Sequence, residues 1–317
     1  MEPVSLADLA EGAATLCLGA DGVATNPLTV VDLGAGRPHG PLPPEPHGVI
    51  VGVGDPSEDA LPLLTTYATP DDLETITATV AVAPIASLTL VGLLDLASEG
   101  SVRDGLVAES LAYSMLLAGS EFRAWRERTQ PGLIPEDDDP VLLERDGNLL
   151  TITLNRPQRH NAFGRAVRDG LLAGLEIAML DPAVSVVLAG NGRSFCSGGD
   201  LDEFGTATDV AAAHLVRVRQ SAGLAVHQIR DRVRVVVHGA CIGAGIEVPA
   251  FAGRVEARAN AYFRLPELGM GLVPGAGGTV SITRRIGRWR TAYLALTDRP
   301  IDVGTALAWG LVDGRAR

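Results

Sequence analysis

The sequence contains no lysine, so arginine supplies all 26 of its basic residues. This absence excludes a lysine Schiff base, a lysine-bound pyridoxal phosphate, a Walker A loop and a lysine general base. Cysteine is also scarce. Cys17, Cys196 and Cys241 are widely spaced and form neither a CxxC motif nor a Cys/His pattern suited to zinc. We therefore expect no metal site and a reducing, cytoplasmic environment.

Signals for export and for a membrane span are weak as well. The first residues, MEPVSLAD, have no basic segment ahead of an apolar one and do not resemble a signal peptide. The best membrane candidate, residues 75–94, is uncharged but contains Pro84, Gly92 and several hydroxyl side chains. Its first residues alternate in polarity, which predicts a buried strand over 75–83 followed by a turn instead of a membrane span.

Acidic residues outnumber basic ones and give a net charge of −12, but the charge is unevenly distributed. Residues 1–139 hold 5 arginines and 22 acidic residues, a net charge of −17, whereas residues 140–317 hold 21 arginines and 16 acidic residues, a net charge of +5. The second part can therefore accept an anionic ligand. We expect no nucleic-acid partner, because the sequence has no basic run or aromatic-basic stripe.

A length of 317 residues allows about two domains. The segment RERTQPGLIPEDDDP (126–140) combines three prolines with three consecutive aspartates and coincides with the change in charge, as an exposed linker would. We predict an acidic N-terminal α/β module over 1–130, a linker over 131–140 and a second domain over 141–317. Another proline-rich stretch, 37–48, predicts an extended loop.

Strands and helices alternate in both parts, which favours an α/β fold. In the N-terminal module we expect strands over 49–53 and 75–83 and a helix over 104–128. The second domain opens with a predicted β-hairpin, whose Asp146-Gly147 turn joins 141–145 to 149–154. The elements predicted after it are a helix over 163–180, a strand over 184–189, a helix over 208–230 and a strand over 232–238.

Two glycine-rich segments follow predicted strands, VVLAGNGRSFCSGGD (186–200) and VVVHGACIGAGIE (235–247). Small side chains there let a ligand approach the backbone amides, although each segment alone also fits a tight turn with no ligand. Val248 stands where a dinucleotide-binding fingerprint has glycine, which counts against a Rossmann site.

These segments belong to a set of four motifs: NRPQRHNAF (155–163), FCSGGD (195–200), HGACIGAGIE (238–247) and LPELGMGLVPGAGGT (265–279). Together the motifs resemble the crotonase superfamily, the enoyl-CoA hydratase/isomerase family, over roughly 140–317. The resemblance implies a crotonase-like ββα superhelix, here preceded by the smaller α/β module. It also implies an acyl-CoA thioester substrate, no cofactor apart from the coenzyme A of that substrate, and a homo-oligomer, either a trimer or a hexamer.

By position, the resemblance implies an oxyanion hole made of the backbone amides of Gly199 and Ala244. A thioester whose α-carbon gains or loses a proton places negative charge on its carbonyl oxygen, and two preorganised amides stabilise that charge. Each donor contributes about 3 kcal/mol. Because the donors are backbone groups, an alanine at position 244 is no disadvantage.

Glu247 and Glu267 fall where hydratases of this family keep their catalytic glutamates. Hydration needs one group to deprotonate water and another to deliver a proton to the α-carbon, so the pair favours an enoyl-CoA hydratase, a lyase. Taken singly, Glu247 also fits a helix cap and Glu267 a loop residue. The alternatives are an enoyl-CoA isomerase, a cofactor-free dioxygenase acting on an aryl-acetyl-CoA, and a non-catalytic thioester-binding subunit.

Six further residues in or beside the motifs are assigned to coenzyme A or substrate binding: Arg159, His160, Arg193, Ser197, Asp200 and Leu201. Arg159 and Arg193 are the preferred ligands of the phosphate groups. His160 is a candidate for the wall of the ligand channel, although a hydrogen-bonded structural histidine explains it better. Cys196 and Cys241 border the expected site without a His–Asp arrangement, and we interpret them as packing residues.

The resemblance also implies a helical segment after the position of GLVDG (310–314), which covers the acyl pocket and contributes to trimer contacts. The sequence instead ends at Arg317 and carries about 140 residues ahead of the matching region. We therefore expect the acidic N-terminal module to supply the cover. Its order of strands and helix also allows a degenerate half-copy of the same fold, without glycine-rich loops of its own.

Overall fold

The computed structural model describes residues 3–11, 16, 19, 24–35, 48–55, 61–133 and 139–316. Three features discussed above lie outside these ranges: Cys17, residues 37–47 of the proline-rich stretch, and residues 134–138 of the predicted linker. The described strands form three sheets, with six, four and three strands.

The six-stranded sheet belongs to the second half of the chain and has the order β13-β10-β8-β7-β6-β5. β5 (Val141–Asp146) and β6 (Leu149–Leu154) form the predicted antiparallel hairpin, with Asp146 opposite Leu149. Alternate residues of β6 are buried, so one face of the sheet carries the core. The remaining neighbours are parallel, and their strands are β7 (Ser185–Gly190), β8 (Val233–Val237), β10 (Arg254–Ala257) and β13 (Gly314–Arg315).

Successive turns of the chain add one strand to this sheet and one to the three-stranded sheet. β8 is followed by β9 (Ala240–Ile242) and β10 by β11 (Tyr262–Arg264), and β12 (Ile301–Asp302) then pairs antiparallel with β11. Helices separate these strand pairs, which gives the ββα superhelix that the motifs predict. The α-helices are α6 (Arg165–Leu180), α7 (Val210–Arg219), α8 (Ala222–Gln228), α9 (Ala244–Glu247), α10 (Gly278–Ile286), α11 (Arg288–Thr297) and α12 (Val303–Trp309).

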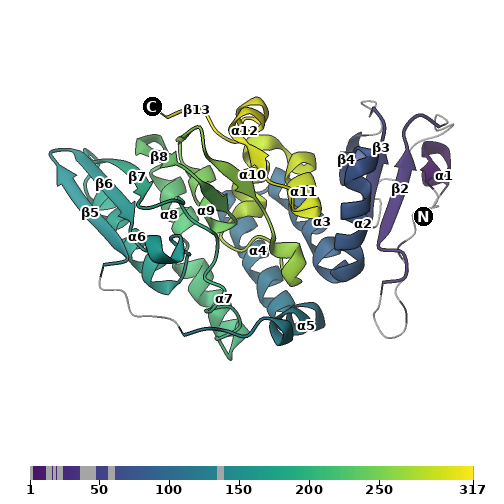
Figure 1. Cartoon of the computed structure of the whole chain (residues 1–317), viewed down its shortest axis with the longest axis horizontal. Coiled ribbons are helices and arrows are strands. Elements are labelled where there is room, and N and C mark those ends of the chain that lie inside the picture. The colour runs from purple at the N-terminus through teal and green to yellow at the C-terminus, as the bar shows by residue number, and fades with distance from the viewer. Residues whose placement is uncertain are drawn as a thin grey trace.

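The N-terminal part consists of a parallel sheet followed by four helices. The sheet has the order β1-β2-β3-β4, and Figure 1 shows it at one end of the molecule, with α2 and α3 between it and the rest. Its elements are β1 (Val4–Ser5), α1 (Leu6–Ala10), β2 (Leu28–Asp32), β3 (Val49–Val53) and β4 (Thr66–Ala68). The helices are α2 (Pro70–Val82), α3 (Pro84–Glu99), α4 (Val102–Leu117) and α5 (Ser120–Arg128).

The strand predicted over 75–83 is wrong, because residues 75–82 belong to α2 and Ala83 caps its end. Threonines that alternate with Ile76, Ala78 and Val80 favour a strand, but the residues before them start a helix. Pro70 occupies the first turn, where its missing N–H costs nothing. The Asp72 carboxylate accepts a hydrogen bond of 2.7 Å from the Thr69 hydroxyl. Ile76 and Val80, four residues apart, then lie on one buried face of the helix.

No single helix in the described ranges is long and apolar enough to cross a membrane. The helices α2 and α3 reach the required length and apolarity only as a pair, and they are bent by 108° relative to each other.

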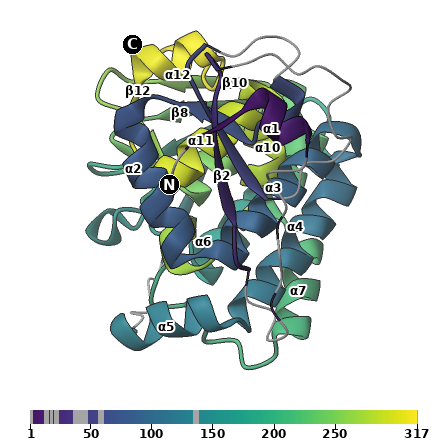
Figure 2. The ribbon, with the colours of Figure 1, turned by 90° about the vertical axis from the view of Figure 1, so that its right-hand side faces the viewer.

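One hydrophobic core extends through both halves of the chain. It contains Leu90 of α3 and Leu116 of α4 together with Val235 of β8 and Ile282 of α10. α3 packs against α10 and α11, and α4 packs against α7 and α10. Figure 2 shows α3, α4 and α7 side by side along this core. A small separate cluster, which includes Leu9 and Ile50, lies at the N-terminal sheet.

Candidate active site

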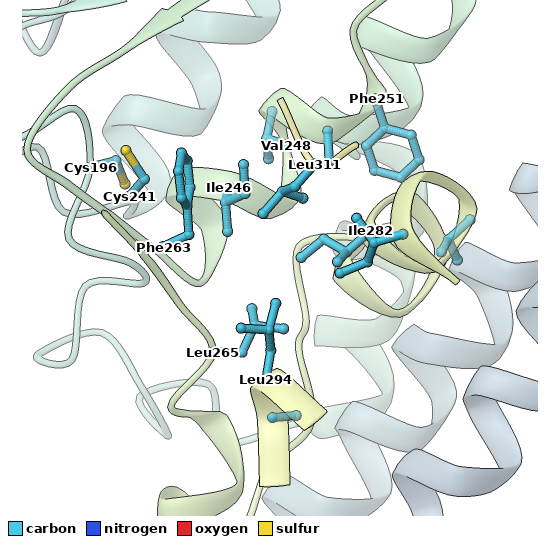
Figure 3. Packing of buried hydrophobic residues seen from close by; sticks show 14 of the residues in the cluster. Cys196, Cys241, Ile246, Val248, Phe251, Phe263, Leu265, Ile282, Leu294 and Leu311 are labelled. Atoms are coloured by element: carbon cyan, nitrogen blue, oxygen red, sulfur yellow. The ribbon is translucent and has the colours of Figure 1, made fainter. Parts of the chain in front are cut away.

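Two glycine-rich loops meet in the second half of the chain, and backbone pairing between Cys196 and Cys241 joins them. The Cys196 amide donates to the Ala240 carbonyl, and the Ile242 amide donates to the Cys196 carbonyl, both at 3.1 Å. Figure 3 shows the two cysteine side chains next to each other. A Cβ at Gly245 would lie 2.4 Å from the Cys196 carbonyl oxygen, so the close approach of the loops requires glycine there.

This pairing brings together residues 199 and 244, each three positions after a paired cysteine. Gly198 and Gly243 precede them with φ angles of 100° and 48°, which glycine adopts without strain. In the described part of the chain, neither the Gly199 amide nor the Ala244 amide donates to a protein oxygen. Both residues line the same cavity, so two available donors border one space.

The cavity has a volume of about 330 Å³, and both halves of the chain form its wall. The second half supplies the two loops, part of α7 and the turn at 275–277. The N-terminal part therefore covers the site, as the sequence led us to expect. Its lining residues are Leu106, Glu109, Ser110, Tyr113 and Leu117 of α4 and Phe122 of α5.

Glu247 and Glu267 both enter this cavity and are buried, with 2% and 7% of their surface exposed. Glu247 ends the short helix α9, and its Oε2 accepts hydrogen bonds of 2.8 Å from the amides of Ala276 and Gly278. Glu267 begins the 3-10 helix η5 (Glu267–Met270). Its Oε2 is buried without a hydrogen-bond partner in the described structure. Buried oxygens normally have a partner, so this atom is available to a bound molecule.

The two carboxyl groups approach each other beside Gly243. A Cβ at this position would lie 2.4 Å from Glu267 Oε1 and 3.5 Å from Glu247 Oε1. Burial raises the pKa of Glu247 to about 7, against the opposing effect of its two amide donors. Burial, and then the charge of Glu247, raise the pKa of Glu267 well above its usual value. Two buried carboxyls whose pKa values are both raised suit acid–base chemistry near neutral pH.

The structure adds a further buried carboxyl group, Glu109, that the motif analysis missed. Its Oε1 accepts from the Gly277 amide at 2.7 Å, and its Oε2 accepts from the Thr279 amide and hydroxyl at 3.0 and 2.7 Å. Burial, and then the charge of Glu247, raise the pKa of Glu109 to about 8. One sequence signal could have found it: Glu109 stands in the helical stripe of Val102, Leu106 and Tyr113, where an apolar residue is expected.

Of the six residues assigned to coenzyme A or substrate binding, Asp200 alone lines the cavity. It is buried and accepts from Arg156 at 3.1 Å and from Arg159 at 2.7 Å. Arg159 also pairs with Asp202 at 2.5 Å, so acidic side chains of the chain itself compensate its charge. Arg165, which is exposed, lines the cavity instead.

The other assigned residues lie outside the lining of the cavity. His160 has its Nδ1 3.3 Å from the Ser194 hydroxyl, which agrees with a hydrogen-bonded structural histidine. Arg193 and Leu201 are exposed, and Ser197 is half-buried.

Cys196 and Cys241 are almost completely buried. Burial raises the pKa of Cys196 to about 12 and the pKa of Cys241 well above its usual value. Both thiols therefore stay protonated at neutral pH, and a thiol is a poor nucleophile in that form. This agrees with their interpretation as packing residues, and Figure 3 shows them near Phe263 and Ile246 in the core.

The second half of the chain is similar in sequence to known proteins. The enoyl-CoA hydratase/isomerase family model matches residues 144–315. The 2,3-dehydroadipyl-CoA hydratase of Escherichia coli (strain K12) is 35% identical over 173 residues, which cover 54% of this chain and 67% of that protein. The trans-2-decenoyl-[acyl-carrier-protein] isomerase of Streptococcus mutans is 32% identical over 181 residues, covering 56% of this chain and 69% of that protein.

The chain is also similar to solved structures of enoyl-CoA hydratases. The enoyl-CoA hydratase of Thermoplasma volcanium matches with a TM-score of 0.52 and 28% identity, covering 56% of this chain and 71% of that chain. A second, from Mycobacterium smegmatis, also matches with a TM-score of 0.52 and 28% identity, covering 56% of this chain and 70% of that chain. Glu109 and the rest of α4 precede the segment matched by the family model.

Proposed function

The chain belongs to the enoyl-CoA hydratase/isomerase family, and from this premise we propose that it adds water to the double bond of a 2-enoyl-CoA thioester. One observation carries the proposal. The buried carboxyls of Glu247 and Glu267 approach each other at Gly243, in the cavity that Gly199 and Ala244 also line. Hydration requires this combination of two carboxyl groups and an oxyanion site.

In the proposed reaction, the thioester oxygen accepts hydrogen bonds from the amides of Gly199 and Ala244. Glu247 removes a proton from water, and the resulting hydroxide forms a bond to the β-carbon. The electron pair of the double bond moves toward the thioester, whose oxygen then carries the negative charge of an enolate. Glu267 delivers its proton to the α-carbon, the enolate collapses to the thioester, and proton exchange through solvent restores both glutamates.

The environments of the two carboxyls support this division of roles. Two amides donate to Glu247, which favours its ionised form, and its pKa of about 7 leaves a substantial ionised fraction at neutral pH. Glu267 is buried beside Glu247, and burial and the charge of Glu247 raise its pKa, which favours its protonated form. A base and an acid therefore coexist at the same pH.

The experiment that tests the proposal follows the loss of the conjugated thioester absorbance of crotonyl-CoA and of a longer 2-enoyl-CoA. Glu247→Gln and Glu267→Gln each remove one proton-transfer group with little change of shape, and each is expected to lower kcat by at least about a hundredfold. Glu127→Gln, at an exposed residue of α5, is the matched control. A wild-type chain that leaves both thioesters unchanged, or a Gln variant of either glutamate with full activity, would contradict the proposal.

Isomerisation is the second candidate, because a relative of 32% identity is named an isomerase. Moving a double bond requires one carboxyl group that removes a proton from one carbon and returns it to another. Under that reaction a 3-enoyl-CoA is converted to its 2-enoyl isomer, and one of the two Gln variants retains most of the activity. Hydration instead requires both glutamates.

A further inference from the structure

A basic side chain, Arg217 of α7, lines the same cavity as Glu247 and Glu267. Its guanidinium lies over the ring of Tyr113, with Cζ 5.0 Å from the ring centroid. The same ring lies against Gly275, where a Cβ would come within 2.4 Å of it. Gly275 immediately precedes the residue whose amide binds Glu247. The Tyr113 ring therefore contacts both Arg217 and the turn whose amides bind Glu247.

The hydrogen-bond partners of Arg217 are all neutral. Its Nε donates to the Ser110 hydroxyl at 3.2 Å, and its Nη2 donates to the Ser114 hydroxyl. Among the described residues, no carboxylate lies within 4.0 Å of the guanidinium, and no group accepts a hydrogen bond from Nη1. Partly buried charges in proteins are normally paired with an opposite charge, so this arrangement has room for an anionic partner.

Two other partly buried arginines of the chain have such a partner. Arg285 pairs with Asp313, and Arg159 pairs with Asp200 and Asp202. Arg232 instead donates to three backbone carbonyl groups. Glu109 is the acid of α4 that acts on Arg217 through space, but its carboxyl is engaged by three donors from residues 277 and 279. With a pKa raised to about 8, Glu109 is largely protonated at neutral pH and does not cancel the charge of Arg217.

We propose that Arg217 determines specificity by binding a carboxylate at the far end of the acyl chain, so that the preferred substrates are CoA thioesters of dicarboxylic acids. The guanidinium is a planar donor that suits a carboxylate, and its unused Nη1 supplies a further donor. The proposal rests on the proposed function, because it places the thioester oxygen at Gly199 and Ala244 and extends the acyl chain past Glu247 toward Tyr113.

The phosphates of coenzyme A are the other anionic groups of the ligand. They are large and strongly hydrated, and the exposed Arg165 at the cavity suits them better than a guanidinium held between α4 and α7. The acyl end is therefore the assigned partner of Arg217, and free coenzyme A serves as the probe that separates the two assignments.

Calorimetric titration of the full chain with saturated thioesters tests the proposal without any turnover. Succinyl-, glutaryl- and adipyl-CoA are compared with butyryl-, valeryl- and hexanoyl-CoA, which have the same chain lengths but no terminal carboxylate. At one or more lengths, we expect the wild-type chain to bind the carboxylate-terminated thioester at least about tenfold more tightly. In Arg217→Met this preference is lost while the affinity for the uncharged thioester is retained. Arg219→Met, at an exposed arginine of the same helix, keeps the preference.

Three outcomes would overturn the proposal: no preference in the wild-type chain at any length, a preference that survives in Arg217→Met, or an Arg217→Met variant that loses affinity for free coenzyme A and for both thioester series equally. The wild-type comparison decides the question even if Arg217→Met does not fold. Because saturated thioesters cannot be hydrated, a chain that prefers the dicarboxylic series but leaves every 2-enoyl-CoA unchanged would sustain this proposal and refute the proposed function.

Discussion

Gly243 has no side chain, and the carboxyl groups of Glu247 and Glu267 lie next to the position that a Cβ would occupy. A Cβ there would overlap Glu267 Oε1 at 2.4 Å, and the φ angle of 48° already disfavours other residues. Gly243→Ala should therefore displace Glu267 and lower kcat by at least about tenfold, because a small misplacement of a catalytic group is costly. Steady-state hydration of crotonyl-CoA measures the effect.

Gly269→Ala is the matched control for this variant. Gly269 lies two residues after Glu267, and a Cβ there would meet no atom within 4 Å. We expect Gly269→Ala to keep the wild-type rate. Equal rates for Gly243→Ala and the wild-type chain would show that the Glu267 carboxyl does not need its present position.

The raised pKa values of the two glutamates predict a bell-shaped dependence of kcat/KM on pH. Glu247 must be ionised to act as the base, so activity should fall as the pH drops below about 7 and Glu247 gains a proton. Glu267 must be protonated, so activity should fall again as it loses its proton at higher pH. Initial rates from pH 5 to 10 test this prediction. Activity that rises steadily toward acid pH would show that Glu247 does not act as the base.

At the level of single residues, the glutamate pair and the two amide positions lie within short, characteristic segments, so the motifs point to them, and the structure brings all four residues to one cavity. Glu109 and Arg217 are more than 100 positions apart in the sequence, and only the packing of α4 on α7 brings them to one cavity. Arg159 was preferred as a phosphate ligand because its motif is adjacent to the site. Its pairing with Asp200 and Asp202 depends on tertiary structure and could not be read from the motif.

Among the secondary-structure elements, the start of α10 connects the two halves of the site. Glu247 accepts from the amides of residues 276 and 278, and Glu109 accepts from those of residues 277 and 279. Four consecutive amides at the N-terminal end of a helix thus bind two carboxyl groups, one from each part of the chain. The helix end favours nearby negative charge, which partly offsets the cost of burying the ionised form of Glu247.

Removing Glu109 should destabilise the protein by about 2 to 4 kcal/mol, because the buried amides of Gly277 and Thr279 lose their acceptors. The comparison is made by denaturant unfolding of wild type and Glu109→Ala at pH 6, where Glu109 is protonated in the folded chain. Glu127→Ala, at an exposed residue, should change the stability by less than about 0.5 kcal/mol. A Glu109→Ala variant as stable as the wild-type chain would mean that α4 does not support α10 through this contact.

Elements whose sequence pattern and local signals agree were predicted well, including the hairpin of β5 and β6 and the long helix α6. The failure at α2 has a local cause, since β-branched residues favour a strand while Pro70 and Asp72 favour the start of a helix. The helix expected over 208–230 is divided in two, because the Ser221 hydroxyl accepts from the Leu224 amide and starts α8.

At the scale of the whole molecule, a hydrophobic core joins the two predicted parts, 1–130 and 141–317. Leu90 and Leu116 from the first part and Ile282 from the second belong to one buried cluster. We expect a single thermal unfolding transition, with equal calorimetric and van't Hoff enthalpies, because neither part can lose its structure without exposing the other. Differential scanning calorimetry measures this. Two separate transitions would indicate two independently folded domains.

The central claim is that the cavity shared by both halves hydrates a 2-enoyl-CoA, and incorporation of labelled water tests it most directly. The protein is incubated with crotonyl-CoA in water enriched in oxygen-18, and the thioester product is analysed by mass spectrometry. The account predicts a 3-hydroxyacyl-CoA that carries one labelled oxygen on its β-carbon, and at least about a hundredfold less of this product with Glu247→Gln in the same early time interval. A wild-type reaction in which all of the crotonyl-CoA is recovered and no labelled 3-hydroxyacyl-CoA forms would contradict it.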